Sequence, residues 1–198
     1  MTGGDRELVI RAVRGERAAF DGLIAPRWGR IYRIALRITG NREEAEDVAQ
    51  QACLRLWNRL GSFRIGEDLD AWIYRMVVNL AIDALRREKA RPELSAIGSG
   101  TVERPAEPVD QAAGPEQRVL ARELERALEA VTADLPPRQK AVFVLTRIEG
   151  FSAAETARLL DVAPSTVRNH LFQLRAQIAR RLRQDYPGLL GIDPGDQT

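Results

Sequence analysis

The chain has 198 residues, which is enough for one large domain or two small ones. Its formal net charge is +2, and it holds one cysteine and one histidine, so an internal disulfide and a cysteine-rich zinc cluster are excluded. The sequence contains no nucleotide-binding loop, metal cluster or nucleophile with its base. We therefore predict that the protein is not an enzyme and binds no cofactor and no metal ion.

The sequence contains no long uninterrupted run of hydrophobic residues. No apolar stretch approaches the roughly 20 residues that a membrane-spanning helix needs, and the N-terminal sequence MTGGDRELVI carries charges instead of the apolar core of a signal peptide. These features predict a cytoplasmic protein without membrane insertion.

Helical periodicity recurs from Arg6 to Arg183 and strand signals are nearly absent, which predicts an all-α protein. Residues 91–117 break this pattern with four prolines, three glycines and few large apolar side chains, a composition typical of a flexible linker. We therefore predict two small helical domains joined by this linker, with the N-terminal domain over residues 1–90, the C-terminal domain over residues 118–185 and a tail over residues 186–198.

The N-terminal domain begins with two predicted helices. The first covers residues 16–38, with an irregularity near Pro26 because proline cannot donate a backbone hydrogen bond. An Asn-x-x-Glu pattern predicts that Asn41 caps the second helix, which runs to Leu60 before Gly61 closes it. Both helices have apolar positions that can pack against a third.

The third predicted helix covers residues 70–89 and has two distinct faces. One is a broad apolar stripe that must be buried, made of Trp72, Ile73, Met76, Val77, Leu80, Ala81, Ala84 and Leu85. The opposite face carries Arg75, Asn79, Asp83, Arg86 and Arg87. Because Asp83 can pair with an arginine one turn away, this face is either a solvated surface with helix-stabilising ion pairs or a nucleic-acid surface, and the charge pattern does not separate the two.

In the C-terminal domain, the stretch SAAETARLLDVAPSTVRNHLFQLR predicts two short helices joined by a tight corner. Ser152 followed by Glu155 forms a capping box at the start of the first helix, and Asp161 lies in the corner. Pro164 suits the first position of the second helix, where its missing N–H is no loss. This arrangement is typical of a DNA-binding helix-turn-helix, although similar hairpins also occur as plain structure.

The second helix of this hairpin also has two faces. Its apolar positions, spaced to point inward, are Val167, Leu171, Leu174 and Ile178. The opposite face combines a guanidinium, amide and hydroxyl groups and an exposed aromatic ring, from Ser165, Arg168, Asn169, Phe172 and Gln173. Such a set can read base edges.

Two local basic clusters are suited to phosphate contacts, although a basic helix end is also an ordinary solvated feature. They consist of Arg86, Arg87, Lys89 and Arg91, and of Arg175, Arg180, Arg181 and Arg183. Taken singly, neither cluster identifies a ligand.

Three stretches together resemble the bacterial sigma-70 family, specifically its extracytoplasmic-function (ECF) sigma factors: NREEAEDVAQQACLRLW, AWIYRMVVNLAIDALRRE and LPPRQKAVFVLTRIEGFSAAETARLLDVAPSTVRNHLFQLRAQIARRL. The resemblance covers nearly the whole chain except the tails and the linker, and its order matters more than any single stretch. The segment NLAIDALRR is similar to sequences of the iron-uptake regulator subgroup.

The resemblance implies an alternative sigma factor, a transcription initiation factor that binds RNA polymerase core and directs it to promoters. It places polymerase contacts at Glu46, Asp47, Gln50 and Arg55. It places recognition and melting of the −10 element at Arg75, Asn79, Asp83, Arg86 and Arg87, with the loop over residues 63–69 able to receive a base. It places recognition of the −35 element at Ser165, Thr166, Arg168, Asn169, Phe172 and Gln173.

The resemblance also implies partners: RNA polymerase core, promoter DNA and an anti-sigma factor, with the chain a monomer when free. Two alternatives remain at the level of sequence. One is a sigma-mimicking adaptor that binds an anti-sigma factor, and the other is a two-domain helix-turn-helix regulator that acts without polymerase core. Intact polar and basic side chains on both reading faces argue against the adaptor.

Overall fold

The protein is described by a computed structural model, which covers residues 3–90, 119, 123, 126–128 and 130–186. The described N-terminal elements are α1 (Gly3–Val13), α2 (Arg17–Ile24), η1 (Ala25–Arg27), α3 (Trp28–Thr39), α4 (Arg42–Arg59), η2 (Leu60–Ser62) and α5 (Leu69–Lys89). The C-terminal ones are α8 (Pro137–Phe143), η3 (Val144–Ile148), α9 (Ala153–Leu160) and α10 (Pro164–Asp185). No named strand occurs among these residues, and the all-α prediction is confirmed.

The predicted linker over residues 91–117 lies outside the described residues, as does the predicted tail apart from Tyr186. In the C-terminal domain, the described helices are α8, α9 and α10, together with the turn η3 between α8 and α9. We call the described residues up to 90 the first unit and those from 126 onward the second unit.

The prediction of one continuous helix over residues 16–38 is wrong. Two helices, α2 and α3, are separated by the 3-10 turn η1, which contains Pro26. A proline cannot donate to the carbonyl four residues earlier, so the chain tightens into a 3-10 turn at the predicted irregularity. α3 then ends at Gly40, which adopts the left-handed conformation with φ of 75°.

The next two helices begin at side-chain caps. The Asn41 side chain accepts a hydrogen bond from the backbone N–H of Glu44 at 3.2 Å and so begins α4 as predicted. At its other end α4 passes into the 3-10 turn η2, with Gly61 inside this turn and not closing the helix. Asp68 begins α5 by accepting hydrogen bonds from the N–H groups of Asp70 and Ala71, at 3.1 and 3.2 Å.

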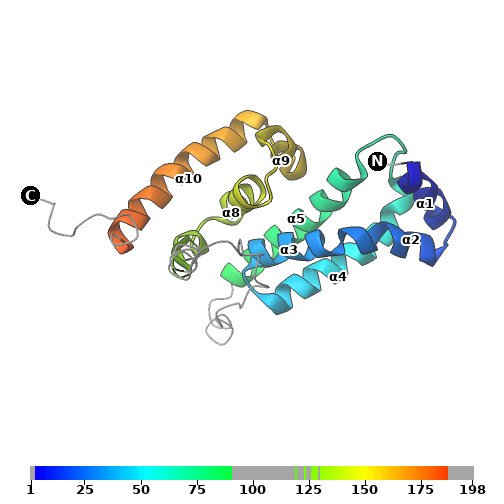
Figure 1. Cartoon of the computed structure of the whole chain (residues 1–198), viewed down its shortest axis with the longest axis horizontal. Helices are drawn as coiled ribbons and strands as arrows, with labels where there is room; N and C mark the ends of the chain where they lie inside the picture. The colour runs from blue at the N-terminus through cyan, green and yellow to red at the C-terminus, as the bar shows by residue number, and fades with distance from the viewer. Residues whose placement is uncertain (1–2, 91–118, 120–122, 124–125, 129, 187–198) are drawn as a thin grey trace, which may run out of the picture.

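The core of the first unit lies where α3, α4 and α5 pack together (Figure 1). Each helix contributes a row of fully buried side chains, led by Ile31, Ile34 and Ile38 from α3, Val48 and Leu56 from α4, and Ile73 and Val77 from α5. Trp72 and Met76, predicted to belong to the apolar stripe of α5, are only half-buried at its edge.

The second unit packs on the first, with α9 and α8 against α5, and α8 and η3 near α3 (Figure 1). This contact buries a side of α5 that the predicted stripe did not include, namely Tyr74, Val78 and Ile82. The stripe predicted from periodicity was too narrow because it counted only the face toward the first unit. Buried residues of both units form one continuous hydrophobic cluster.

Candidate nucleic-acid and polymerase interfaces

The predicted helix-turn-helix is formed by α9 and α10. At the start of α9 the Ser152 N–H donates to Oε2 of Glu155 at 2.8 Å, and the Glu155 N–H donates to Oγ of Ser152 at 3.2 Å. Hydrogen bonding to the Glu155 carboxylate from the side chain of Ser152, and then from its backbone N–H, lowers the pKa of Glu155. Asp161 turns the corner in the left-handed conformation at φ 53°, and Pro164 occupies the first turn of α10.

α10 is held by few buried side chains. Val167 and Leu174 are buried, whereas Leu171 and Ile178, both predicted to point inward, are only half-buried. The described elements that pack on α10 are α9 and α8 (Figure 1). α10 therefore presents most of its surface to the exterior.

The predicted −35 face of α10 is exposed. Five of its six side chains are exposed, Thr166 is half-buried, and Phe172 is 78% exposed, which is unusual for a large aromatic ring. An apolar ring that is exposed to this extent is suited to contact a ligand. The exposed members of the face are Ser165, Arg168, Asn169, Phe172 and Gln173.

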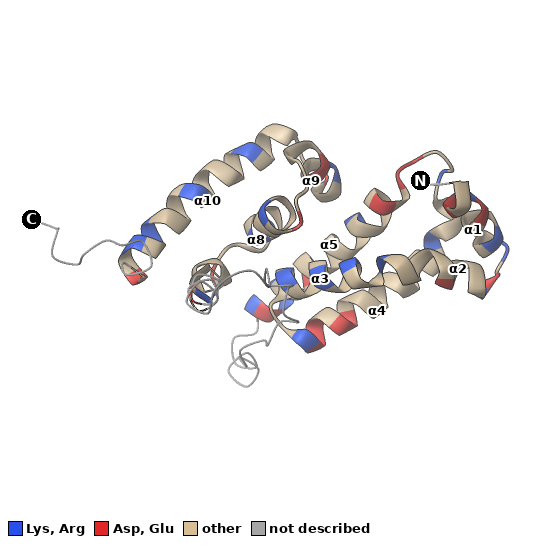
Figure 2. Ribbon diagram, viewed as in Figure 1, with Lys and Arg blue, Asp and Glu red and all other residues tan. Residues whose placement is uncertain are grey.

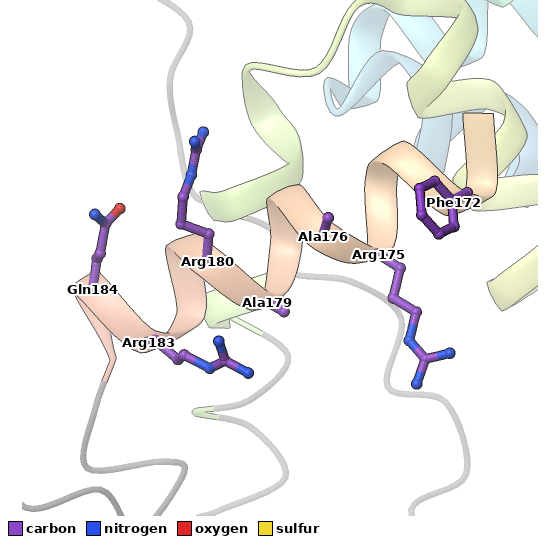
Figure 3. A pocket seen from close by; sticks show the side chains of 7 residues that line it. All are labelled: Phe172, Arg175, Ala176, Ala179, Arg180, Arg183 and Gln184. Atoms are coloured by element: carbon purple, nitrogen blue, oxygen red, sulfur yellow. The ribbon is translucent and has the colours of Figure 1, made fainter. Parts of the chain in front are cut away.

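A groove of about 610 Å³ begins at Phe172 and follows α10 toward its C-terminal end (Figure 3). Figure 3 shows the short side chains of Ala176 and Ala179 between the longer ones of Arg175, Arg180 and Arg183. The surface therefore combines positive charge with space for a bulky, negatively charged partner.

Two members of the basic clusters bond residues more than 40 positions away in the chain. Arg181 donates to Asp134 at 2.9 Å and approaches the carbonyl of Val131, while Lys89 donates to the carbonyl of Leu135 at 2.7 Å. Positive charge on the outer surface therefore comes from the remaining arginines, spaced along α10 in Figure 2.

The predicted −10 face of α5 is also exposed. All five of its side chains are exposed, and the predicted pair between Asp83 and Arg86 is present at 3.4 Å. This ion pair lies on the surface, where such pairs contribute little to stability and chiefly orient the guanidinium. The exposed residues are Arg75, Asn79, Asp83, Arg86 and Arg87.

The loop before α5 is fixed at both ends and exposed between them. Phe63 is buried and its ring lies 5.3 Å from that of Trp72, while Leu69 is almost fully buried. Residues 64–68 are exposed, with Gly66 at φ 113°. Trp72 thus supports the loop from the side of the core and is not a free stacking surface.

Arg27 joins the first turn of α5 to the N-terminal helix α1. Its guanidinium donates to the carboxylates of Asp70 on α5 and Asp5 on α1, the latter at 3.1 Å. Burial opposes the charge on Arg27, but the bonds to Asp70 and Asp5 outweigh it and raise its pKa above the ordinary value. The start of α5 is therefore tied to α1.

The predicted polymerase face lies on α4, whose first turn is acidic (Figure 2). All four predicted side chains, Glu46, Asp47, Gln50 and Arg55, are exposed. The sequence analysis missed Leu54, which is 65% exposed. Leu54 lies seven residues after Asp47 and therefore shares its helix face, and its place outside the buried stripe of α4 is the signal that could have identified it.

Among the described residues, no group of three or more His, Cys, Asp or Glu side chains is placed to hold a metal ion. No helix in the described parts of the chain has the length and hydropathy needed to cross a membrane.

Comparison with known proteins identifies both units. The sigma-70 region 2 family model matches residues 25–91, and a sigma-70 region 4 family model matches residues 125–178. The chain is 33% identical over 178 residues to the ECF RNA polymerase sigma factor SigM of Mycobacterium tuberculosis, covering 90% of this chain and 84% of that one. It is 30% identical over 180 residues to the ECF RNA polymerase sigma factor SigW of Bacillus subtilis, covering 90% and 96%.

Solved structures show the same fold. CnrH in complex with the cytosolic domain of CnrY matches with a TM-score of 0.63 at 23% identity, covering 92% of this chain and 99% of that one. The sigma factor RpoE in complex with the anti-sigma factor NepR from Bartonella quintana matches with a TM-score of 0.61 at 18% identity, covering 84% and 98%. The chain belongs to the sigma-70 family and is an ECF RNA polymerase sigma factor.

Proposed function

We propose that this sigma factor contacts its promoter through the exposed faces of α5 and α10 while α4 docks on RNA polymerase core. The observation that carries the proposal is the placement of the polar side chains: each unit exposes one helix face rich in guanidinium and amide groups. The polymerase supplies the chemistry, so the chain needs no catalytic group of its own.

For the −35 element, we propose that the N-terminal half of α10 lies in the major groove. A guanidinium such as that of Arg168 favours guanine, the amides of Asn169 and Gln173 favour adenine, and Phe172 can touch a thymine methyl. Ser165 and Thr166, in the first turn of α10, are suited to contact the phosphate backbone. The arginines along the groove continue this surface toward neighbouring phosphates.

For the −10 element, we propose that α5 and the loop over residues 64–68 hold an opened strand. Extruding a base costs a few kcal/mol of unstacking energy. Contacts to the extruded base and to the single strand must offset this cost. Asn79 can bond a base edge, and Arg75, Arg86 and Arg87 can contact phosphates. Asp83 orients Arg86 through their ion pair.

For polymerase docking, we propose that the exposed face of α4 binds a surface that is basic with an apolar centre. Glu46 and Asp47 supply negative charge, Gln50 and Arg55 add hydrogen bonds, and Leu54 adds apolar area. Residues of this mixed kind at the centre and rim are typical of protein interfaces.

Further partners follow from the family. Because RpoE matches this fold and its structure holds an anti-sigma factor, we propose that an anti-sigma factor also binds this chain. We propose further that the free chain is a cytoplasmic monomer. Assignment to the iron-uptake regulator subgroup remains a prediction from sequence.

The test is reconstituted transcription with core polymerase on a library of genomic DNA fragments, followed by mapping of start sites. We expect new start sites that share two elements, and Asp47→Ala should lower both polymerase binding and transcript yield. Asp21→Ala, an exposed acid on α2, is the matched control and should change neither. If the chain binds operator DNA without core and yields no new start sites, it is a polymerase-independent regulator instead.

A further inference from the structure

We infer that Arg27 and helix α1 hold the loop over residues 64–68 in place and thereby set base preference at the −10 element. Arg27 is a positioning residue in this role, because it bonds the supports of the loop and not the DNA. The inference rests on the base-receiving role proposed for that loop. It gives a role to α1, which lies outside the match to the sigma-70 region 2 family model because that match begins at residue 25.

The Arg27 guanidinium has a different partner at each of its three nitrogens. Nε donates to Oδ1 of Asp70 at 2.5 Å, and Nη2 donates to Oδ1 of Asp5 at 3.1 Å. Nη1 donates to the backbone carbonyl of Leu23 at 2.8 Å. The Arg27 side chain is only 12% exposed. Because charge-assisted bonds hold this planar group in three directions, it links the position of α5 to that of α1.

The loop is anchored at both ends. At its first end, Phe63 is buried in the core. At its second end, the Asp68 carboxylate accepts hydrogen bonds from the N–H groups of Asp70 and Ala71 and so begins α5. Arg27 bonds the Asp70 side chain within this same first turn. The position of the second anchor therefore depends on the bond between Arg27 and Asp70.

Helix α1 contacts the chain on both sides of the loop. It packs against η2, which ends one residue before Phe63 (Figure 1). It also carries Asp5, which is joined through Arg27 to the start of α5. Val9 and Ala12 bury one side of α1 in the core, so α1 is itself fixed. A fixed helix that reaches both anchors keeps the two ends of the loop at a constant separation.

Between its anchors the loop faces solvent. Residues 64–68 are exposed, and Ile65 among them is 48% exposed. Gly66 has a φ of 113°, a conformation that side chains strain. An exposed apolar side chain suits contact with the ring face of an extruded base. Selecting one base over another requires contacts held to within about 0.5 Å, and the two anchors provide this precision.

The first measurement follows the second anchor in the free chain. Arg27→Gln removes the charge and keeps a polar side chain. Hydrogen exchange by NMR should then become about tenfold faster at the amides of Asp70 and Ala71, because the cap that they form opens more often. The amide of Glu44, in the capped first turn of α4, is the internal control and should keep its rate.

The second measurement is base preference in the holoenzyme, taken as the ratio of promoter-opening rates for the best and worst base at the extruded position. Arg27→Gln should lower this ratio about tenfold, because the loop no longer holds the base precisely. Preference at the −35 element should not change. Asp70→Asn cuts the same bond from its more exposed side and should lower the ratio too. The double variant should fall no further than Arg27→Gln alone, because both changes remove one shared interaction.

Asp5→Asn tests the contribution of α1. It leaves the bond between Arg27 and Asp70 in place, so the ratio should fall by a smaller factor of about three. Arg11→Gln is the matched control, because it breaks an exposed ion pair with Glu16 at the other end of α1. It should change neither amide exchange nor base preference. Urea unfolding of each variant separates these effects from a general loss of stability.

Two results would overturn the inference: unchanged exchange at Asp70 and Ala71 in folded Arg27→Gln, or an unchanged base ratio in both Arg27→Gln and Asp70→Asn. Ile65→Ala, within the loop, separates this failure from that of the proposed function. If Ile65→Ala alters the ratio and the other two variants do not, the inference alone is wrong. If neither Ile65→Ala nor Asn79→Ala alters it, the proposed −10 site is wrong, and amide exchange still decides whether Arg27 positions the loop.

Discussion

The two helices proposed to contact the promoter are built differently. α5 has ten buried residues among 21, whereas α10 has two among 22. α5 is therefore a core helix, and α10 is a surface helix. α5 is enclosed by its own unit on one side and by the second unit on another. Only one narrow face of α5 remains for DNA, while most of α10 is accessible.

This difference predicts the largest effect for a core substitution in α5. Ile73→Ala removes a side chain that is 1% exposed at the centre of the first unit and should lower the free energy of unfolding by about 3 kcal/mol. Ile178→Ala, the matched change at a half-buried position of α10, should cost about 1 kcal/mol or less. Urea unfolding followed by circular dichroism measures both. Equal losses would show that α10 is as firmly packed as α5.

The next effect concerns DNA reading by α10. Arg168→Ala should weaken discrimination at one position of the −35 element by about 1–3 kcal/mol, because a guanidinium that contacts a guanine edge is lost. Polymerase binding should be unchanged, since α4 is untouched. Competition binding of the holoenzyme to promoter variants gives the measurement.

Arg183→Ala is the matched control for Arg168→Ala, because this exposed arginine lies in the last turn of the same helix. It should weaken binding to all sequences alike and reduce the salt dependence. A sequence-specific loss for Arg183→Ala but not for Arg168→Ala would reverse the proposed orientation of α10.

A smaller effect is expected on α5, where one narrow face carries the contacts. Asn79→Ala should slow promoter opening at sites with a preferred −10 base and cost about 1–2 kcal/mol in the open complex, the loss of one specific contact. Permanganate footprinting of the melted strand reports opening. Asp21→Ala, the exposed acid on α2, is again the control. Unaltered opening across several promoters for Asn79→Ala would remove that residue from the proposed site.

Local signals in the sequence account for much of the fold. The caps at Asn41 and Ser152 and the proline at residue 164 were predicted from short patterns, because such bonds join residues at most three positions apart. The exposure of the predicted faces on α5 and α10 followed from helical periodicity, whereas the residues on α4 were predicted from the family resemblance. Whether these exposed residues perform their proposed roles stays a prediction.

Contacts between distant segments could not be predicted from those signals. The burial of Val78 depends on packing of the second unit on α5, and the partners of Glu149 lie on α3, more than 100 residues earlier. Similarly, Lys89 and Arg181 have the sequence appearance of phosphate ligands, yet each bonds a carbonyl or carboxylate of the protein. A cluster of charged residues in the sequence does not show which of their side chains are already bonded to other groups of the folded protein.

The smallest predicted effect concerns the capping box that begins α9, the helix before α10. The pKa of Glu155 is lowered in the folded chain, chiefly by its bonds with Ser152, so its ionised form contributes stability above the ordinary value of 4.5. That contribution is lost as the pH falls through the lower folded pKa. Glu155→Gln should therefore lower the thermal midpoint slightly at pH 7, and the gap to the unmodified chain should narrow as the pH falls below 4.5. A gap that stays constant down to pH 3 would mean that the carboxylate charge adds nothing to the cap, and that α9 is positioned by packing against α5 alone.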